Sequence, residues 1–259
     1  MPLVLALILS LVVSCLGWAA RALAPGGAAV ASAIGTLVLW QTGWPGAAAL
    51  GAFFAGSTLV SRLAPDSASR RGEAKGSRRD GWQVLANGGA AALGALIEAV
   101  SPGAGIWLVA GSLAGAAADT WATSWGGWSR QPPRDVLSGA VVSPGTSGGV
   151  TLMGTAGSVA GAATVAGAAV AAGAPGPLGL VALVIGVAAM GLDSVLGAGA
   201  QGRFHCDRCA LPTERRVHRC GTPARHVGGW SWLSNDGVNA LATSIAALAG
   251  WLGWRWWQP

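Results

Sequence analysis

The sequence LGLVALVIGVAAMGLDSVLGAGA occupies residues 178–200 and contains one ionisable side chain, that of Asp193. An apolar run of about 18 residues or more is long enough to cross the hydrocarbon core of a bilayer as an α-helix. The whole chain has this character, since 52% of its 259 residues are hydrophobic and only 10% are charged. An average globular protein has about 25% charged residues. We therefore predict an all-α, polytopic membrane protein that forms a single integral membrane domain over residues 1–259.

The composition also excludes three other classes of protein. The 42 glycines follow no G-X-Y period, which excludes a collagen. Hydrophobicity is too high and charge too low for an intrinsically disordered chain. The strands of a membrane β-barrel alternate over about ten residues, whereas the apolar runs here last about 18–24 residues.

Apolar runs separated by charged or Gly- and Pro-rich breaks predict eight membrane-spanning helices. Six or seven crossings remain an alternative if some runs merge or tilt. The first run contains Val12-Val13-Ser14-Cys15, which loosely resembles a lipoprotein cleavage site. A secretory signal requires Lys or Arg before its apolar run, and none precedes this one. We therefore interpret the run as a helix that stays in the protein. The predicted spans are residues 2–20, 26–43, 45–63, 82–101, 103–122, 147–172, 178–200 and 236–257.

Positive charge is distributed unevenly over the connections between these spans. All but one of the 16 Lys and Arg residues follow the first, third, fifth or seventh span, and the exception is Arg255. Because cytoplasmic loops concentrate Lys and Arg, we predict a multi-pass protein of the cell membrane with cytoplasmic long loops and both termini outside. These loops include a basic loop over residues 64–81, which contains Arg70, Arg71 and Lys75, and a Cys/His loop over residues 201–234.

Small residues recur at helical spacing within the predicted spans. Glycines four residues apart, as in Gly111/Gly115 and Gly157/Gly161, place two small positions on one helix face. Such positions let helix backbones approach closely in a membrane. We therefore predict a tightly packed bundle with little room for a wide aqueous pore.

Polar side chains within the spans gather toward the predicted cytoplasmic side. An ionisable group inside a bilayer is costly, so Asp119 and Asp193, which lie away from helix starts, are candidates for function. Carboxylate and amide oxygens that converge on one face suit Mg²⁺, especially where phosphates complete its coordination. Helix capping, above all by Asn235, and hydrogen bonds between helices are the alternatives. Glu98 lies near the opposite side, with either a functional or a structural role open. The candidate site comprises Asp119, Asp193, Asp236, Asn87, Asn235 and Asn239.

A Gly-rich turn over residues 143–149 opens the predicted span 147–172 on the same side. The free N–H groups and positive dipole end of a helix N-terminus favour an anion, which makes this turn a candidate phosphate seat. Arg78 and Arg79 precede the span 82–101 on that side, although the ordinary positive charge of cytoplasmic loops also explains them. The candidate phosphate-binding residues are Arg78, Arg79, Gly145, Thr146, Ser147, Gly148 and Gly149.

The Cys/His loop contains Cys206-x-x-Cys209 followed by His218-x-Cys220. Three thiols and an imidazole are a complete tetrahedral set for zinc, and thiols stay reduced in the cytoplasm. The first spacing is typical of zinc sites and the second is tighter than usual, so a redox pair or idle thiols remain alternatives. We predict a structural Zn²⁺ held by all four side chains, with no open position for catalysis.

Five stretches of the chain together resemble one family. In order and spacing they are similar to the polytopic membrane family of transmembrane protein 19, which includes the plant phytyl-phosphate kinase of tocopherol synthesis. The resemblance extends roughly from the second predicted span to the eighth. The stretches are RRDGWQVLANG at 78–88, ADTWAT at 118–123, PGTSGGV at 144–150, DSVLGA at 193–198 and NDGVN at 235–239.

This resemblance implies transfer of a phosphoryl group from a nucleoside triphosphate, such as CTP, to an isoprenoid monophosphate in the membrane lipid, with Mg²⁺. Asp119, Asp193 and Asp236 would organise metal or phosphate, and the three asparagines of the candidate site would support them. The acceptor is already a phosphate oxygen, so no general base is required. Nucleic acid is not an expected partner. The chain departs from the family's pattern at Ser124, where an acidic residue is usual, and altered or lost activity is therefore an alternative.

Two other classes of function fit parts of the sequence. A transporter or flippase of a lipid phosphate or small solute also has polar helix ends and Gly-broken segments. Transporters place their sites near the bilayer midplane, whereas the polar residues here lie on one side. The third class is a non-catalytic membrane scaffold whose zinc loop binds a partner. This alternative is favoured if Ser124 indicates that the catalytic activity has been lost.

Overall fold

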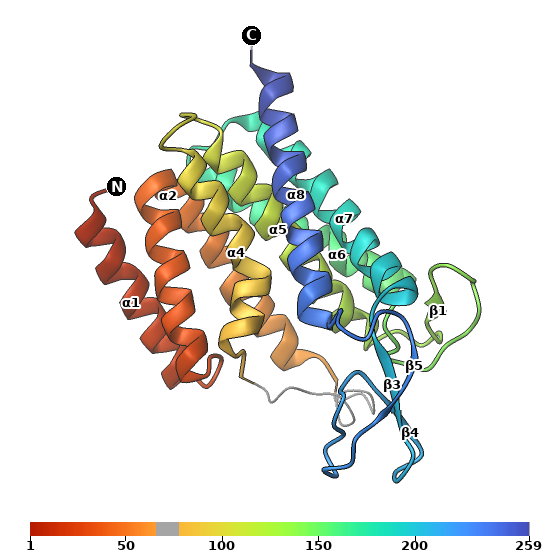
Figure 1. Ribbon diagram of the computed structural model, residues 1–259. Coiled ribbons are helices and arrows are strands. Elements are labelled where there is room, and N and C mark those ends of the chain that lie inside the picture. The colour runs from red at the N-terminus through yellow and green to blue at the C-terminus, as the bar shows by residue number, and fades with distance from the viewer. Residues whose placement is uncertain (66–77, 259) are drawn as a thin grey trace.

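The computed structural model describes residues 1–65 and 78–258, which form a helical bundle with small sheets at one end (Figure 1). We call this the loop end; both chain termini lie toward the opposite, terminal end. Two strands pair antiparallel as β1–β2, and three form an antiparallel sheet of order β4-β3-β5. The helices are α1 Leu3–Ala19, α2 Pro25–Leu63, α4 Gly81–Ile97, α5 Gly105–Gly126, α6 Leu152–Ala171, α7 Gly176–Gly199 and α8 Asn235–Trp257. The strands are β1 Arg134–Asp135, β2 Gly149–Val150, β3 Arg203–Cys206, β4 Leu211–Thr213 and β5 Arg225–Gly228.

The described residues form seven helices, so the predicted count of eight is not confirmed. Both predicted spans 26–43 and 45–63 lie in α2, which bends at Gly43 without an intervening loop. Gly43 has φ +63° and ψ −146°, and Pro45 follows, which lacks the N–H of a regular helical turn. A Cβ on Gly35 would lie 3.8 Å from the Leu50 side chain, so the two halves of α2 pack against each other. The basic loop 64–81 lies largely outside the described residues, and with it Arg70, Arg71 and Lys75.

Many large apolar side chains of the described helices lie on the outside of the bundle. Three of them, α2, α6 and α7, are long and apolar enough to cross a membrane, and α1 is a shorter apolar helix. The buried face of α1 consists of Ala6, Ser10, Ser14 and Gly17, while its leucines are mostly exposed. A soluble helix has the opposite arrangement, so these exposed surfaces suit contact with lipid.

Helix α5 forms the centre of the bundle and packs against α2, α4, α6, α7 and α8. Every residue from Gly105 to Ala118 is buried. A Cβ on Gly161 of α6 would lie 2.7 Å from the carbonyl oxygen of Ala117, and one on Gly157 would lie 2.7 Å from that of Trp121. The predicted close packing through glycine is therefore confirmed at this interface.

Gly161→Ala is expected to destabilise the protein by about 1–3 kcal/mol, because the added methyl group would force α6 away from α5. Gly167→Ala is the matched control on the same helix, since nothing lies within 4 Å of its Cβ position. Alanine there should leave stability unchanged or raise it, because alanine favours the helix more than glycine does. Thermal unfolding of both variants in one detergent measures the difference, and equal effects would contradict the packing assignment.

The connections at the terminal end are short. Glu98 holds the one between α4 and α5, where its Oε1 accepts a hydrogen bond from Gly103 N at 2.6 Å and its Oε2 accepts one from Gly105 N at 2.7 Å. Residues 172–175 connect α6 to α7. Glu98 therefore has a structural role at the start of α5, which resolves the choice that the sequence leaves open.

Candidate functional site

Two carboxylates lie next to each other between α5 and α7. A Cβ on Gly115 would lie 3.0 Å from the Cβ of Ala189, which places the two helices in contact there. Asp119 and Asp193 each follow that contact by four residues, one helical turn closer to the loop end. The two carboxylates interact electrostatically, and Asp193 Oδ2 is buried without a hydrogen-bond partner among residues 1–65 and 78–258. Adjacent buried carboxylates repel each other, and a cation between them relieves that repulsion.

Helix α8 brings three more of the predicted residues to the loop end. It packs against α4, α5 and α7, and Thr243 Oγ1 donates a hydrogen bond to the Ala86 carbonyl oxygen at 3.0 Å. Asp236 and Asn239 lie in the first turns of α8, on the loop-end side of this contact. The interpretation of Asn235 as the N-cap is wrong, because Ser234 caps the helix by accepting a hydrogen bond from Gly237 N at 3.3 Å.

Helix α4 contributes Asn87, which belongs to a ladder of polar contacts at its start. Asn87 Nδ2 donates to the Gln83 carbonyl oxygen at 2.9 Å. Gln83 Oε1 accepts a hydrogen bond from Asp80 N at 3.0 Å, while Asp80 Oδ1 accepts one from Gln83 N at 2.9 Å. This reciprocal capping box fixes the start of α4 and so orients Asn87.

The two arginines before α4 lie in different environments. Arg78 is exposed, beside Trp18 and Arg21. Arg79 is fixed by its backbone, which donates to Ala22 O at 3.0 Å, and its guanidinium carbon lies 5.7 Å from the centre of the Phe53 ring. Burial lowers the pKa of Arg79, and no carboxylate of the described residues pairs with it.

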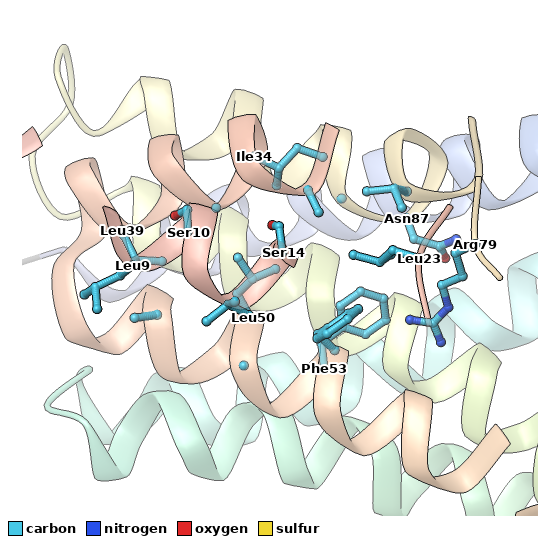
Figure 2. Close-up of a pocket in the computed structure, with 18 of the residues that line it drawn as sticks. Leu9, Ser10, Ser14, Leu23, Ile34, Leu39, Leu50, Phe53, Arg79 and Asn87 are labelled. Carbon is cyan, nitrogen blue, oxygen red and sulfur yellow. The ribbon is translucent and has the colours of Figure 1, made fainter. Parts of the chain in front are cut away.

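A cavity of about 300 Å³ opens among α1, both halves of α2 and α4, as Figure 2 shows. Most of its walls are apolar, and they include Leu9, Leu39 and Leu50. Hydropathy does not predict this cavity, because its lining comes from helices whose mutual arrangement the apolar runs do not encode. The serines on the buried face of α1 were the one available signal. The polar side chains of one end are Arg79, Gln83, Asn87 and Thr120.

The Gly-rich turn does not form a helix N-terminus. Helix α6 begins at Leu152 rather than at residue 147, and Thr151 caps it by accepting a hydrogen bond from Gly154 N at 2.9 Å. Gly149 belongs to strand β2, and its N–H donates to the Thr146 carbonyl oxygen at 3.0 Å. Ser147 Oγ donates to Gln201 Oε1 at 3.0 Å, so the turn packs on the loop end of α7, just beyond Asp193.

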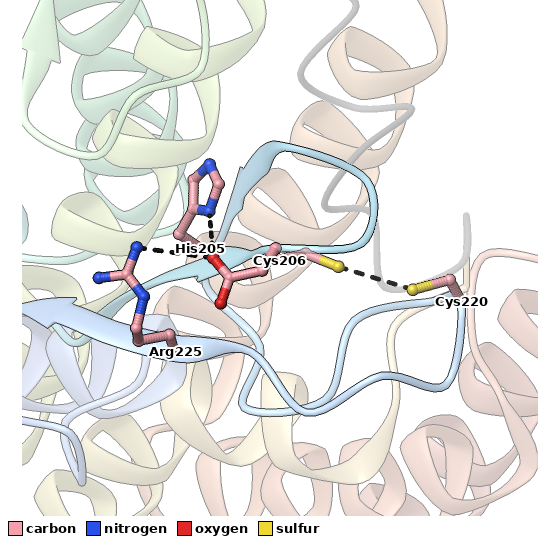
Figure 3. A network of polar contacts seen from close by, with 5 residues as sticks. His205, Cys206, Cys220 and Arg225 are labelled. Atoms are coloured by element: carbon pink, nitrogen blue, oxygen red, sulfur yellow. Dashed lines mark hydrogen bonds and ion pairs between the residues drawn. The ribbon is translucent and has the colours of Figure 1, made fainter.

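The Cys/His loop brings its four predicted ligands together. Cys206 and Cys209 lie on the β3–β4 hairpin, and the four donor atoms of the cluster with His218 and Cys220 all lie within 4.8 Å of one another. The sulfur atoms of Cys206 and Cys220 point toward each other (Figure 3) and are 3.6 Å apart, and His218 Nδ1 lies 3.2 Å from Cys220 Sγ. Tetrahedral zinc with Zn–S bonds of about 2.3 Å requires sulfurs about 3.8 Å apart, so the set fits zinc.

Local hydrogen bonds distinguish the thiols of this cluster and fold the loop around it. Hydrogen bonds from Thr222 and His218 lower the pKa of Cys220 to about 5, which favours a thiolate at neutral pH, whereas the hydrogen bond with Cys220 raises the pKa of Cys209 to about 11. Asp207 Oδ1 lies 3.2 Å from His205 Nδ1 and 3.5 Å from Arg225 Nη2, so strands β3 and β5 are tied together beside the cysteines (Figure 3). The cluster therefore sits in a folded loop rather than in a free segment.

The loop is also anchored to the bundle. Trp230 N donates to Ala200 O at 2.8 Å, and Gly202 N donates to Leu233 O at 2.9 Å, which joins the loop to the ends of α7 and α8. Glu214 from this loop interacts electrostatically with Asp193. Local spacing does not connect Glu214 with the carboxylates, because 20 residues lie between it and Asp193 along the chain.

Comparison with known proteins places the chain among membrane proteins. The sequence model of a family described as integral membrane protein DUF92 matches residues 8–247. The chain belongs to this DUF92 family. This membership confirms the resemblance to a polytopic membrane family. No curated protein and no solved structure matches the chain.

The DUF92 match runs from α1 into α8 and includes every candidate residue described above. The description of the DUF92 family specifies a membrane protein and no reaction. Ser124, the departure from the pattern of the resemblance, is buried on α5 with 6% of its surface exposed. Glu214 adds negative charge near Asp193 from a different part of this DUF92 chain.

Proposed function

We propose that the protein is a membrane-embedded kinase that transfers a phosphoryl group from a nucleoside triphosphate, such as CTP, to an isoprenoid monophosphate. The observation that carries this proposal is the adjacent pair Asp119 and Asp193, with one buried oxygen that has no hydrogen-bond partner among the described residues. A carboxylate pair of this kind suits a divalent cation that also binds phosphates. The polar end of the cavity begins at Thr120, the residue after Asp119, where a lipid phosphate would meet the nucleotide.

Mg²⁺ supplies charge neutralisation when bound, and the side chains of this protein hold and orient the phosphates. Asp119 and Asp193 would be its ligands, and Asp236, Asn87, Asn235 and Asn239 would support them from α4 and α8. Arg79 faces the acceptor phosphate from within the bundle, and exposed Arg78 is available to the nucleotide. The turn over 145–149 borders the site on α7 through Ser147 and Gly148.

The loop end faces the cytoplasm in this proposal, and both termini lie outside. Arg130 and Arg134 follow α5, and six arginines lie between Arg203 and Arg225, all at the loop end. Positive residues concentrate in cytoplasmic loops. Nucleoside triphosphates are available on that side, so in this orientation the nucleotide reaches the carboxylates directly from the cytoplasm.

Zinc is the structural cofactor of the Cys/His loop in this proposal. The four donor atoms leave no position for substrate when zinc is bound. Its contribution is to fold residues 201–234 and to hold Glu214 near Asp193.

The test is a kinase assay on purified protein in nanodiscs. Phytyl, geranylgeranyl and longer isoprenoid monophosphates are each offered with Mg²⁺ and each of the four nucleoside triphosphates. We expect isoprenoid diphosphate with at least one pair and none after chelation of Mg²⁺. If folded, zinc-loaded protein gives no product with any pair, the kinase is overturned, and lipid-phosphate transfer between leaflets of proteoliposomes becomes the function to measure.

A further inference from the structure

The cavity among α1, α2 and α4 has the shape of a site for an elongated molecule. Its lining runs from Ala31 to Leu39 along the first half of α2, about 12 Å of helix rise. Figure 2 shows Arg79 and Asn87 toward one end and Leu9 and Leu39 toward the other. Its volume of about 300 Å³ is at the lower limit for small-molecule sites, which suits one hydrocarbon chain rather than two.

Charge and polarity distinguish the two ends of this cavity. Arg79 is the only cation in its lining among the described residues, and no carboxylate of the described chain lines it. An unpaired cation removed from water is costly, and an anion that binds it regains that free energy. Guanidinium groups bind phosphate oxygens through paired N–H donors, and the amides of Gln83 and Asn87 lie at the same end.

The cavity also opens to the lipid-facing surface. Val13 of α1 and Gly51 of α2 both line it and are both exposed. The buried Ser10 side chain also lines the cavity (Figure 2), and its hydroxyl has no hydrogen-bond partner in the described chain. A lipid chain can therefore enter sideways between α1 and α2 without leaving the membrane.

We infer that this cavity binds a single-chain lipid phosphate, with the phosphate on Arg79 and the hydrocarbon chain extended between α1 and α2 toward the terminal end. This inference deepens the proposed function and rests on it for the identity of the lipid, the isoprenoid monophosphate acceptor. Thr120 lines the polar end and follows Asp119 along α5, so the cavity and the carboxylate pair share one turn of this helix. The length of the cavity then sets a minimum chain length for tight binding.

The test measures binding of geranylgeranyl monophosphate to protein in nanodiscs without nucleotide. Gly51→Leu extends a side chain from a position with nothing within 4 Å, so it narrows the cavity without a backbone clash. We expect it to weaken binding at least tenfold, while Gly167→Leu on the lipid-facing side of α6 leaves binding unchanged. Arg79→Gln should weaken binding of the monophosphate at least tenfold and leave that of geranylgeraniol unchanged.

The outcomes distinguish a failure of the cavity as the binding site from a failure of the proposed kinase activity. Unchanged binding in Gly51→Leu, or equal loss in Gly167→Leu, overturns the cavity as the chain-binding site. If binding depends on Gly51 and Arg79 while no nucleotide yields diphosphate, the cavity is supported as the lipid-phosphate site. That result overturns the proposed kinase activity. If Gly51→Leu forms diphosphate at the wild-type rate when the acceptor is limiting, the kinase activity is supported. The cavity is then overturned as the acceptor-binding site.

Discussion

Asp193→Asn is expected to lower diphosphate formation about 10³-fold while the thermal stability of the protein holds or rises. An amide removes the negative charge that would bind Mg²⁺, so transfer stops. The same change removes the repulsion between Asp193 and Asp119, which opposes folding in the absence of a cation. Activity and stability are therefore expected to change in opposite directions, which a merely structural carboxylate would not produce.

The control is Glu98→Gln, the same acid-to-amide change at the other end of the bundle. The Glu98 carboxylate accepts two backbone N–H groups, and glutamine offers only one acceptor oxygen. We expect this variant to lose about 1–3 kcal/mol of stability and to keep its rate per folded molecule. Melting curves and initial rates of both variants, from one nanodisc preparation, give the comparison. Full activity in Asp193→Asn would contradict the assignment of Asp193 as a metal ligand.

Cys209→Ser is expected to abolish zinc binding and to unfold the Cys/His loop. Wild-type protein should contain one zinc per chain by elemental analysis, because all four donors lie within 4.8 Å. Folding of small zinc-bound loops depends on the metal, whose binding contributes on the order of 10 kcal/mol. Protease cleavage within 201–234 should therefore accelerate at least tenfold in the variant and equally after treatment of the wild type with a chelator.

Cys15→Ser provides the matched control for this experiment. Cys15 is an exposed, free cysteine on α1, away from the cluster. Its replacement should leave zinc content, cleavage and thermal stability unchanged. Zinc content that is the same in Cys209→Ser as in the wild type would show that the four side chains do not bind the metal together.

Hydropathy and local spacing were sufficient for the parts of the structure that depend on neighbours in the chain. The apolar runs predicted a helical membrane protein, and the Gly157/Gly161 spacing predicted a close helix contact, which α6 makes with α5. The four Cys and His positions also converge as their spacing indicated. Asp119 and Asp193 stood out because a carboxylate within an apolar run is costly, and the structure places them together.

Features that depend on the packing of distant segments were not predictable in this way. The bend at Gly43 lets the two predicted spans adjoin without a loop, because the non-helical φ and ψ of this glycine turn the chain between the two halves of α2. Residues 149–150 pair with β1, which delays the start of α6 beyond a glycine-rich turn that resembles a helix N-terminus. The cavity and the approach of Glu214 to Asp193 require several helices to meet, which no local pattern encodes.

The short connections at the terminal end also bear on how the protein enters the membrane during synthesis. The bend at Gly43, residues 98–104 and residues 172–175 carry one ionisable side chain between them, that of Glu98, and Gly103 N and Gly105 N already bond to it. With the loop end in the cytoplasm, no polar domain has to be carried across the bilayer. The nascent chain can therefore insert as successive helical hairpins, and the Cys/His loop folds on the side where it was made.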